Sequence, residues 1–135
     1  MLEIDVKLKM IGQAKQVVEK AYAPYSRFKV AAVLLCADGR IFVGVNVENS
    51  SYGLTCCAER IAVFNALSAG AYGFKYMILY TPTKELTYPC GACRQVLSEF
   101  CSDLEILLLC NEKELEVSLK KLLPSRFKIE AKDEK

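Results

Sequence analysis

The 135-residue sequence contains no histidine and no tryptophan, and its continuous apolar runs are short. Without histidine, any zinc site must be built from thiolates and carboxylates, and a general base must be a carboxylate or a rarer group. The apolar run 106–110 has five residues, far below the roughly 20 that span a bilayer. The composition therefore excludes a transmembrane helix and restricts metal ligands to cysteine and acidic side chains.

A strong charge of one sign is also lacking. Lysine and arginine number 18 against 16 acidic residues, and the net charge of +2 is too small to suggest a nucleic-acid polymer as partner. The first residues, 1–5, mix acidic with apolar side chains and lack the cationic region of a secretory signal. Apolar residues make up 53% of the chain, which is typical of a globular protein. We expect a soluble cytoplasmic protein with no membrane partner.

What the chain does have is seven cysteines, an odd number that favours a reducing compartment with free, buried or metal-bound thiols. Cys36, Cys101 and Cys110 lie in apolar runs and are expected in the core. Cys56 adjoins Cys57, and neighbouring residues on a helix point about 100° apart. Only one of these two is therefore expected to bind a given ion, and we take Cys56 as the bystander.

The other three cysteines combine with one glutamate into a candidate metal site. Cys57 is followed two residues later by Glu59, and Cys90 and Cys93 form a Cys-x-x-Cys pair preceded by proline. Three thiolates fill three positions around Zn²⁺ and leave the fourth for water, which ionises near neutral pH when zinc holds it. Glu59 is placed to manage the protons of that water. The pattern predicts a hydrolytic site with one zinc ion.

Two other interpretations of the cysteines remain open. A Cys-x-x-Cys pair alone is also a redox motif, although here it follows a loop in the second half of the chain rather than an early strand. A non-catalytic module with a structural zinc ion would need a fourth protein ligand, which would have to be Cys56 or Cys101.

Apolar spacing predicts helices alternating with strands after an opening hairpin. The expected helices cover 5–22, 57–69, 90–100 and 119–123, and the expected strands cover 28–36, 40–47, 76–80, 104–109 and 115–117. This order predicts an α/β fold, a three-layer α/β/α sandwich with a mixed sheet of about five strands. No repeat or linker is present, so we expect residues 1–135 to form one domain, with 129–135 a frayed tail. Cys57 and Cys90 then fall at helix N-termini, where the dipole favours thiolates.

Five stretches of the chain, in order, resemble the small homotetrameric cytidine deaminases over almost the whole length. They are 23–28 (Ala-Pro-Tyr-Ser-Arg-Phe), 44–49 (Gly-Val-Asn-Val-Glu-Asn), 57–60 (Cys-Ala-Glu-Arg), 89–95 (Pro-Cys-Gly-Ala-Cys-Arg-Gln) and 122–124 (Leu-Leu-Pro) with Phe127. The resemblance implies the cytidine deaminase-like fold and a homotetramer with active sites at subunit interfaces. It also implies one Zn²⁺ per subunit.

The resemblance assigns roles around the metal. It implies that Cys57, Cys90 and Cys93 are the zinc ligands and that Glu59 is the catalytic proton shuttle. Three thiolates leave the centre with a net negative charge, and a cation hydrogen-bonded to them would restore the acidity of the metal. In the family the arginine after the Cys-Ala-Glu triplet does so, which assigns Arg60. Arg94 either assists Arg60 or forms a surface salt bridge.

The resemblance also assigns the substrate contacts. Asn46 and Glu48 match residues that hydrogen-bond the ribose hydroxyls, and Phe28 matches an aromatic ring that packs against the pyrimidine. The backbone N–H of Ala58 is expected to position the base edge. Phe127 matches a ring that reaches the site of a neighbouring subunit, so its role requires an oligomer.

The implied reaction is the hydrolytic deamination of cytidine and deoxycytidine to uridine and deoxyuridine in pyrimidine salvage, with release of ammonia. Zinc-bound hydroxide attacks C4 while Glu59 carries the protons. The nearest alternative is a related small-molecule deaminase, such as one acting on blasticidin S, but those relatives lack the arginine found here at Arg60. A polynucleotide deaminase is disfavoured because the chain has no basic stripe with interleaved aromatic residues.

Overall fold

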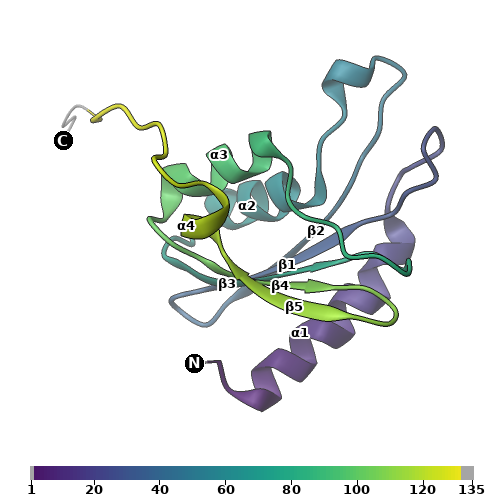
Figure 1. The fold of residues 1–135 in the computed structure, drawn as a ribbon, viewed down its shortest axis with the longest axis horizontal. Helices are drawn as coiled ribbons and strands as arrows, with labels where there is room; N and C mark the ends of the chain where they lie inside the picture. Colours follow the sequence, from purple (N-terminus) through teal and green to yellow (C-terminus); the bar gives the residue numbers. More distant parts are fainter. Residues whose placement is uncertain (1, 132–135) are drawn as a thin grey trace.

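A mixed five-stranded sheet with the order β2-β1-β3-β4-β5 carries the fold in the computed structural model, which describes residues 2–131 (Figure 1). The strands are β1 (Ala31–Cys36), β2 (Ile41–Val45), β3 (Phe74–Tyr80), β4 (Glu105–Leu109) and β5 (Glu114–Ser118). Strand β1 pairs antiparallel with β2 and β3, β3 pairs parallel with β4, and β4 pairs antiparallel with β5. The predicted mixed sheet is confirmed.

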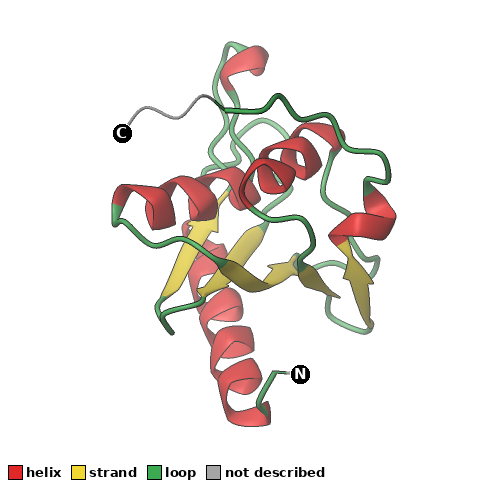
Figure 2. Ribbon diagram, turned by 90° about the vertical axis from the view of Figure 1, so that its left-hand side faces the viewer, coloured by secondary structure: helices red, strands yellow, loops and turns green. Residues whose placement is uncertain are grey.

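Helices cover both faces of this sheet, which confirms the three layers (Figure 2). Helix α1 (Ile4–Val17) lies on one face, and α2 (Ala58–Ser68), α3 (Gly91–Phe100) and α4 (Leu119–Leu122) lie on the other (Figure 1). Short 3₁₀ turns occupy Val18–Lys20 and Tyr52–Leu54. Among residues 2–131, no helix combines the length and the apolar character needed to cross a membrane.

The alternating direction of the side chains along β1 explains why both faces of the sheet are covered. Successive side chains of a strand point to opposite faces, and all six residues of β1 are apolar and buried. The residues of one face of β1 pack with Met10, Ala14 and Val18 from the first helical segments, and those of the other face pack with Ala58, Ala62, Val63 and Ala66 of α2. The sheet therefore separates two apolar cores and contributes side chains to both.

Gly44 on β2 sets how closely α2 approaches the sheet. A Cβ atom at this position would lie 2.4 Å from Ala58 O and 2.4 Å from Ala62 N. Only glycine allows this approach, because such a distance is far inside van der Waals contact. The N-terminus of α2, where Cys57 stands, is thereby fixed over β2.

The ends of several elements differ from the predictions. The helix expected over 5–22 ends at Val17 and continues as one 3₁₀ turn. The strand expected from residue 28 begins at Ala31, because Phe28 O and Val30 N bond to the side-chain amide of Asn46 instead of a neighbouring strand. Of the predicted tail, 129–131 are exposed and lie outside helices and strands, while 132–135 lie outside the described residues.

Candidate metal centre and active site

Three thiols converge at one place between α2 and α3. Cys57 Sγ lies 3.9 Å from Cys90 Sγ, Cys90 Sγ lies 3.5 Å from Cys93 Sγ, and all three sulfur atoms lie within 4.8 Å of one another. Tetrahedral Zn²⁺ with Zn–S bonds of about 2.3 Å separates its sulfur ligands by about 3.8 Å. The observed spacing therefore fits a zinc ion.

Helix N-termini present these thiols. Cys57 is the N-cap residue of α2, Cys90 is the N-cap residue of α3, and Cys93 lies buried in the first turn of α3. Neither cap side chain hydrogen-bonds the backbone of its own helix, so both sulfur atoms are free for a metal. Unpaired N–H groups at each helix start favour the thiolate form. The expectation that the two helix starts lie side by side and bring their thiols together is confirmed.

The cluster favours a thiolate at Cys57 without any metal. Hydrogen bonds from Cys93, Arg60 and Cys90 together lower the pKa of Cys57 to about 5, against the opposing effect of burial. The same Cys57–Cys93 hydrogen bond raises the pKa of Cys93, which burial raises as well. One proton is thus shared within the pair, and a divalent cation would displace it.

The two arginines differ in what they contact. Arg60 Nη2 donates to Cys57 Sγ at 3.5 Å, as expected for a cation beside the thiolates. Arg94 donates from Nε to Pro89 O at 2.8 Å and from Nη1 to Leu122 O at 2.9 Å. Both expectations for Arg94 were therefore wrong, because its partners are backbone carbonyls that only the tertiary fold brings near. Arg94 braces the segment that carries Cys90.

Glu59 is a buried carboxyl beside the thiols, with 4% of its surface exposed. Burial, with a smaller contribution from the negative charge of Cys57, raises the pKa of Glu59 to about 7. A carboxyl that titrates near neutral pH both accepts and releases protons under working conditions. This is the behaviour that a proton shuttle needs.

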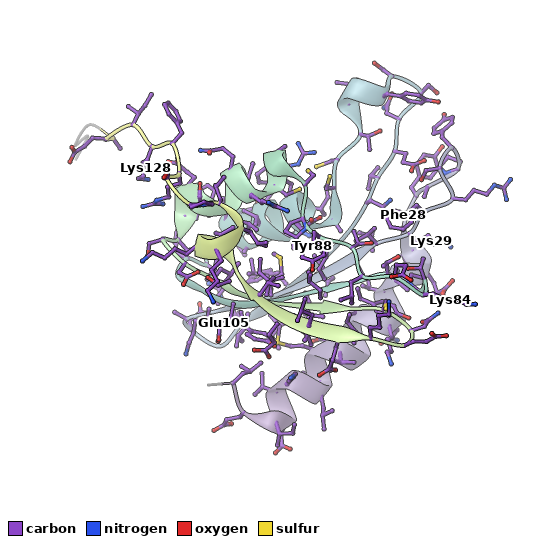
Figure 3. The ribbon with its side chains drawn as sticks, viewed as in Figure 1. Phe28, Lys29, Lys84, Tyr88, Glu105 and Lys128 are labelled. Carbon is purple, nitrogen blue, oxygen red and sulfur yellow. The ribbon has the colours of Figure 1, made fainter. Side chains whose placement is uncertain are left out.

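A cavity of about 180 Å³ opens beside the thiol cluster. The sequence had indicated six of its lining residues: Phe28, Asn46, Cys57, Ala58, Glu59 and Cys90. It had not indicated the other four, which are Val30, Thr55, Thr87 and Tyr88. Phe28 and Tyr88 come from different segments, one before β1 and the other before α3 (Figure 3). The Tyr88 position directly before the Pro-Cys pair was the one available signal for this second aromatic wall.

Asn46 and Glu48 do not face the same hollow. Asn46 lines the cavity with the thiols, whereas Glu48 lines a neighbouring hollow of about 380 Å³. Thr55 lines both. Asn46 is buried, and its Oδ1 accepts from Val30 N at 2.9 Å while its Nδ2 donates to Phe28 O at 2.7 Å. The cavity and the hollow therefore adjoin at Thr55.

Phe127 stands apart from the cavity of its own chain. Its side chain is 66% exposed and is not among the residues that line the cavity. Its carbonyl oxygen accepts from Gln95 Nε2 at 3.1 Å, which ties the segment after α4 to α3. A ring placed in this way contacts no part of the thiol site within one chain.

Neither candidate for a fourth protein ligand joins the thiols. Among residues 2–131, the metal-type cluster consists of Cys57, Cys90 and Cys93, without Cys56 and Cys101. Cys101 instead donates from Sγ to Leu97 O at 3.2 Å. Three protein ligands with an open position are typical of catalytic zinc, whereas structural sites have four. The fold and this centre define a zinc-dependent hydrolase.

Comparison with known proteins gives the family. The family described as "Cytidine and deoxycytidylate deaminase zinc-binding region" matches residues 5–108. The chain is 46% identical over 126 residues to a cytidine deaminase of Sporosarcina psychrophila, covering 92% of each chain. It is 45% identical over 123 residues to that of Halalkalibacterium halodurans, covering 90% of this chain and 93% of the relative. The protein belongs to the cytidine and deoxycytidylate deaminase family.

Solved structures agree with this assignment. The crystal structure of cytidine deaminase from Burkholderia pseudomallei matches with a TM-score of 0.84 at 46% identity, covering 89% of this chain and 98% of that one. Cytidine deaminase from Mycobacterium tuberculosis matches with a TM-score of 0.80 at 38% identity, covering 94% of this chain and all of that one (100%). The cytidine deaminase-like fold expected from the sequence is confirmed, and in this zinc-binding family the Cys57, Cys90 and Cys93 cluster is the zinc site.

Proposed function

We propose that this protein hydrolyses cytidine and deoxycytidine to uridine and deoxyuridine with release of ammonia, as in pyrimidine salvage. The observation that carries the proposal is the buried Glu59 carboxyl beside the three-thiol centre, on the wall of a cavity of about 180 Å³. Arg60, which contacts Cys57, favours a plain nucleoside substrate, because the blasticidin-type deaminases lack an arginine at this position.

Each group of the site has a task in this reaction. Zinc held by Cys57, Cys90 and Cys93 supplies Lewis-acid activation of water when it is bound. Glu59 takes up a proton from the water, passes it to N3 of the pyrimidine and helps to protonate the departing amine. Arg60 offsets part of the negative charge of the thiolates.

The substrate contacts follow the division between the cavity and the hollow. We assign the pyrimidine to the cavity, with its face against Phe28 and its edge near the backbone N–H of Ala58. We assign the ribose hydroxyls to Asn46 and Glu48, which lie on the two sides of Thr55. Offset packing of aromatic rings favours a planar base against Phe28.

We also propose a homotetramer in which Phe127 completes the site of a neighbouring subunit. The 66% exposure of Phe127 supports this proposal, because an exposed aromatic ring is suited to burial in an interface. The seven unpaired cysteines support a reducing compartment such as the cytoplasm. We further propose that residues 1–135 form a single domain.

The test is the ultraviolet absorbance of cytidine incubated with zinc-loaded protein, with ammonia assayed in parallel. Glu59→Ala should retain zinc and fold while losing at least about 100-fold in turnover. Glu112→Ala, which removes an exposed acid, is the matched control and should keep full activity. A zinc-loaded wild-type protein that leaves cytidine unchanged refutes the proposal.

A further inference from the structure

The two groups assigned to base and sugar, Phe28 and Glu48, belong to separate segments that meet at Ser26. These segments run side by side, joined by a parallel bridge between Tyr22 and Val47. They leave the same end of the sheet (Figure 1). A side chain that ties one segment to the other therefore fixes the sugar contact relative to the base contact.

The carboxylate of Glu48 is held by donors from the opposite segment. Oε1 accepts from Tyr25 N at 2.9 Å and from Ser26 N at 3.1 Å, and Oε2 accepts from Ser26 Oγ. A carboxylate offers about four acceptor positions. The protein fills both positions of Oε1 and one of Oε2, so a single position on Oε2 stays open for a substrate hydroxyl.

The same hydroxyl also holds the backbone of Phe28. Phe28 N donates to Ser26 Oγ at 3.0 Å. Arg27, between them, has φ 60°, a left-handed conformation that is uncommon for a residue other than glycine. Such a conformation persists only where surrounding contacts hold it. On the far side, Asn46 Nδ2 donates to Phe28 O at 2.7 Å.

We propose that Ser26 is the positioning residue that couples the sugar contact to the base contact. Its hydroxyl donates to Glu48 and accepts from Phe28 N, which one O–H group can do at the same time. The inference rests on the proposed function, because that function assigns the ribose to Glu48 and the pyrimidine to Phe28. Ser26 thereby fixes the separation of carboxylate and ring before the nucleoside binds.

Preorganisation of this kind affects substrate binding more than chemistry. Ser26 is not among the residues that line the cavity with Glu59, so it has no role in moving protons. It spares the complex the entropy cost of ordering the Glu48 side chain and the turn before Phe28. A substitution that weakens binding of the substrate and of the transition state equally raises KM and leaves kcat unchanged.

The first experiment compares steady-state kinetics of Ser26→Ala, Ser26→Thr and the wild type. Ser26→Ala should raise KM for cytidine about 10- to 140-fold, the loss expected for a hydrogen bond to a charged group. Its kcat should stay within about twofold. Ser26→Thr keeps the hydroxyl and should restore most of the affinity. Ser102→Ala removes an exposed serine elsewhere and should match the wild type.

The second experiment does not depend on catalysis. Hydrogen exchange of the zinc-loaded protein should show faster exchange of the Phe28 amide in Ser26→Ala, and wild-type exchange in Ser26→Thr and Ser102→Ala. Unchanged exchange in Ser26→Ala overturns the proposal, as does a KM equal to that of the wild type. A fall in kcat as large as the rise in KM overturns it too. If the wild type leaves cytidine unchanged, the proposed function fails, and the exchange result alone then decides whether Ser26 links the segments.

Discussion

Arg60 Nη2 lies 3.5 Å from Cys57 Sγ, three residues back on the same helical turn. This places a cation on the sulfur that the cluster itself already favours as a thiolate. The contact links the N-cap residue of helix α2 to the first turn of the same helix. It also makes the charge of the centre adjustable by a single substitution.

Arg60→Gln should therefore weaken zinc binding about 10-fold or more, as expected for the loss of a group that supports metal ligands. The measurement is competition for zinc with a chromogenic chelator. Lys75→Gln removes an equal charge from an exposed position at the start of β3 and serves as control. Equal zinc affinity in the two variants would contradict a role for Arg60 at the metal.

Removal of a zinc ligand should be clearly distinguishable from removal of another cysteine. Cys93→Ser should abolish stoichiometric zinc binding, because hard hydroxyl oxygen replaces a buried thiolate within the cluster. Cys101→Ser, at a cysteine that donates to Leu97 O instead, should keep one zinc ion per chain. Metal analysis after dialysis measures both, and full zinc content in Cys93→Ser would remove this residue from the ligand set.

Gly44→Ala should destabilise the fold by about 3 kcal/mol, since the added Cβ would collide with the backbone of α2 at 2.4 Å. Because α2 would have to move, zinc affinity should fall as well. Gly12→Ala is the matched substitution in α1, where nothing lies within 4 Å of the new atom. It should stabilise the protein by about 1 kcal/mol. Urea unfolding measures both, and equal stabilities would contradict the close packing of α2.

Asp103 should make stability depend on acid pH. Burial alone would raise its pKa, but hydrogen bonds from Lys120 N, Ser118 Oγ and Leu104 N lower it below the ordinary value. Because the pKa of Asp103 is lower in the folded than in the unfolded chain, the unfolded chain binds more protons in this pH range. The stabilisation that Asp103 contributes to the fold is therefore complete above about pH 3.9, the ordinary pKa of an aspartate. It is lost as the pH falls through the folded pKa.

The measurement for Asp103 is the difference in unfolding free energy between the wild type and Asp103→Asn, since acid effects on the metal site cancel in it. The variant should be about 1 kcal/mol less stable at pH 7. The difference should shrink below about pH 3.9. Glu112→Gln, at an exposed acid, should show no difference at either pH. A constant difference across this range would contradict the linkage.

Tyr88→Ala should raise KM for cytidine about 10-fold, because stacking of a base on an aromatic side chain contributes about 1–3 kcal/mol. Tyr88 lines the same cavity as Phe28 but comes from a different segment of the chain. The next residue, Pro89, accepts a hydrogen bond from Arg94 through its carbonyl oxygen. Tyr72→Ala removes a tyrosine that is 65% exposed and does not line the cavity, and its KM should not change. A wild-type KM in Tyr88→Ala would show that the second aromatic wall takes no part in binding.

The sequence predicted the metal centre because its spacing is local. Cys57 with Glu59, and Cys90 with Cys93, each lie within one helical turn, so the chemistry of each pair is visible before folding. The sheet was predictable for a similar reason, since the alternation of residues in β1 and β3 is a property of short segments.

The lining of the cavity was not predictable in this way. Val30, Thr55 and Thr87 carry no chemical signal of their own, and they meet only because three separate segments end near the same edge. The partners of Arg94 were missed because backbone carbonyls are present at every residue, so no side-chain pattern marks them. Asn46 replaces strand pairing at Phe28 and Val30, which is why β1 begins later than its apolar run.

Zinc held by Cys57 and Cys90 would also act as a cross-link between positions 33 residues apart. Closing a loop of that length lowers the conformational entropy of the unfolded chain and so stabilises the fold by about 4 kcal/mol, as a disulfide would. In a reducing compartment, where disulfides do not persist, the ion can serve as the staple that keeps α2 and α3 together. Loss of the metal would then destabilise the packing of α2 against α3 as well as abolish catalysis.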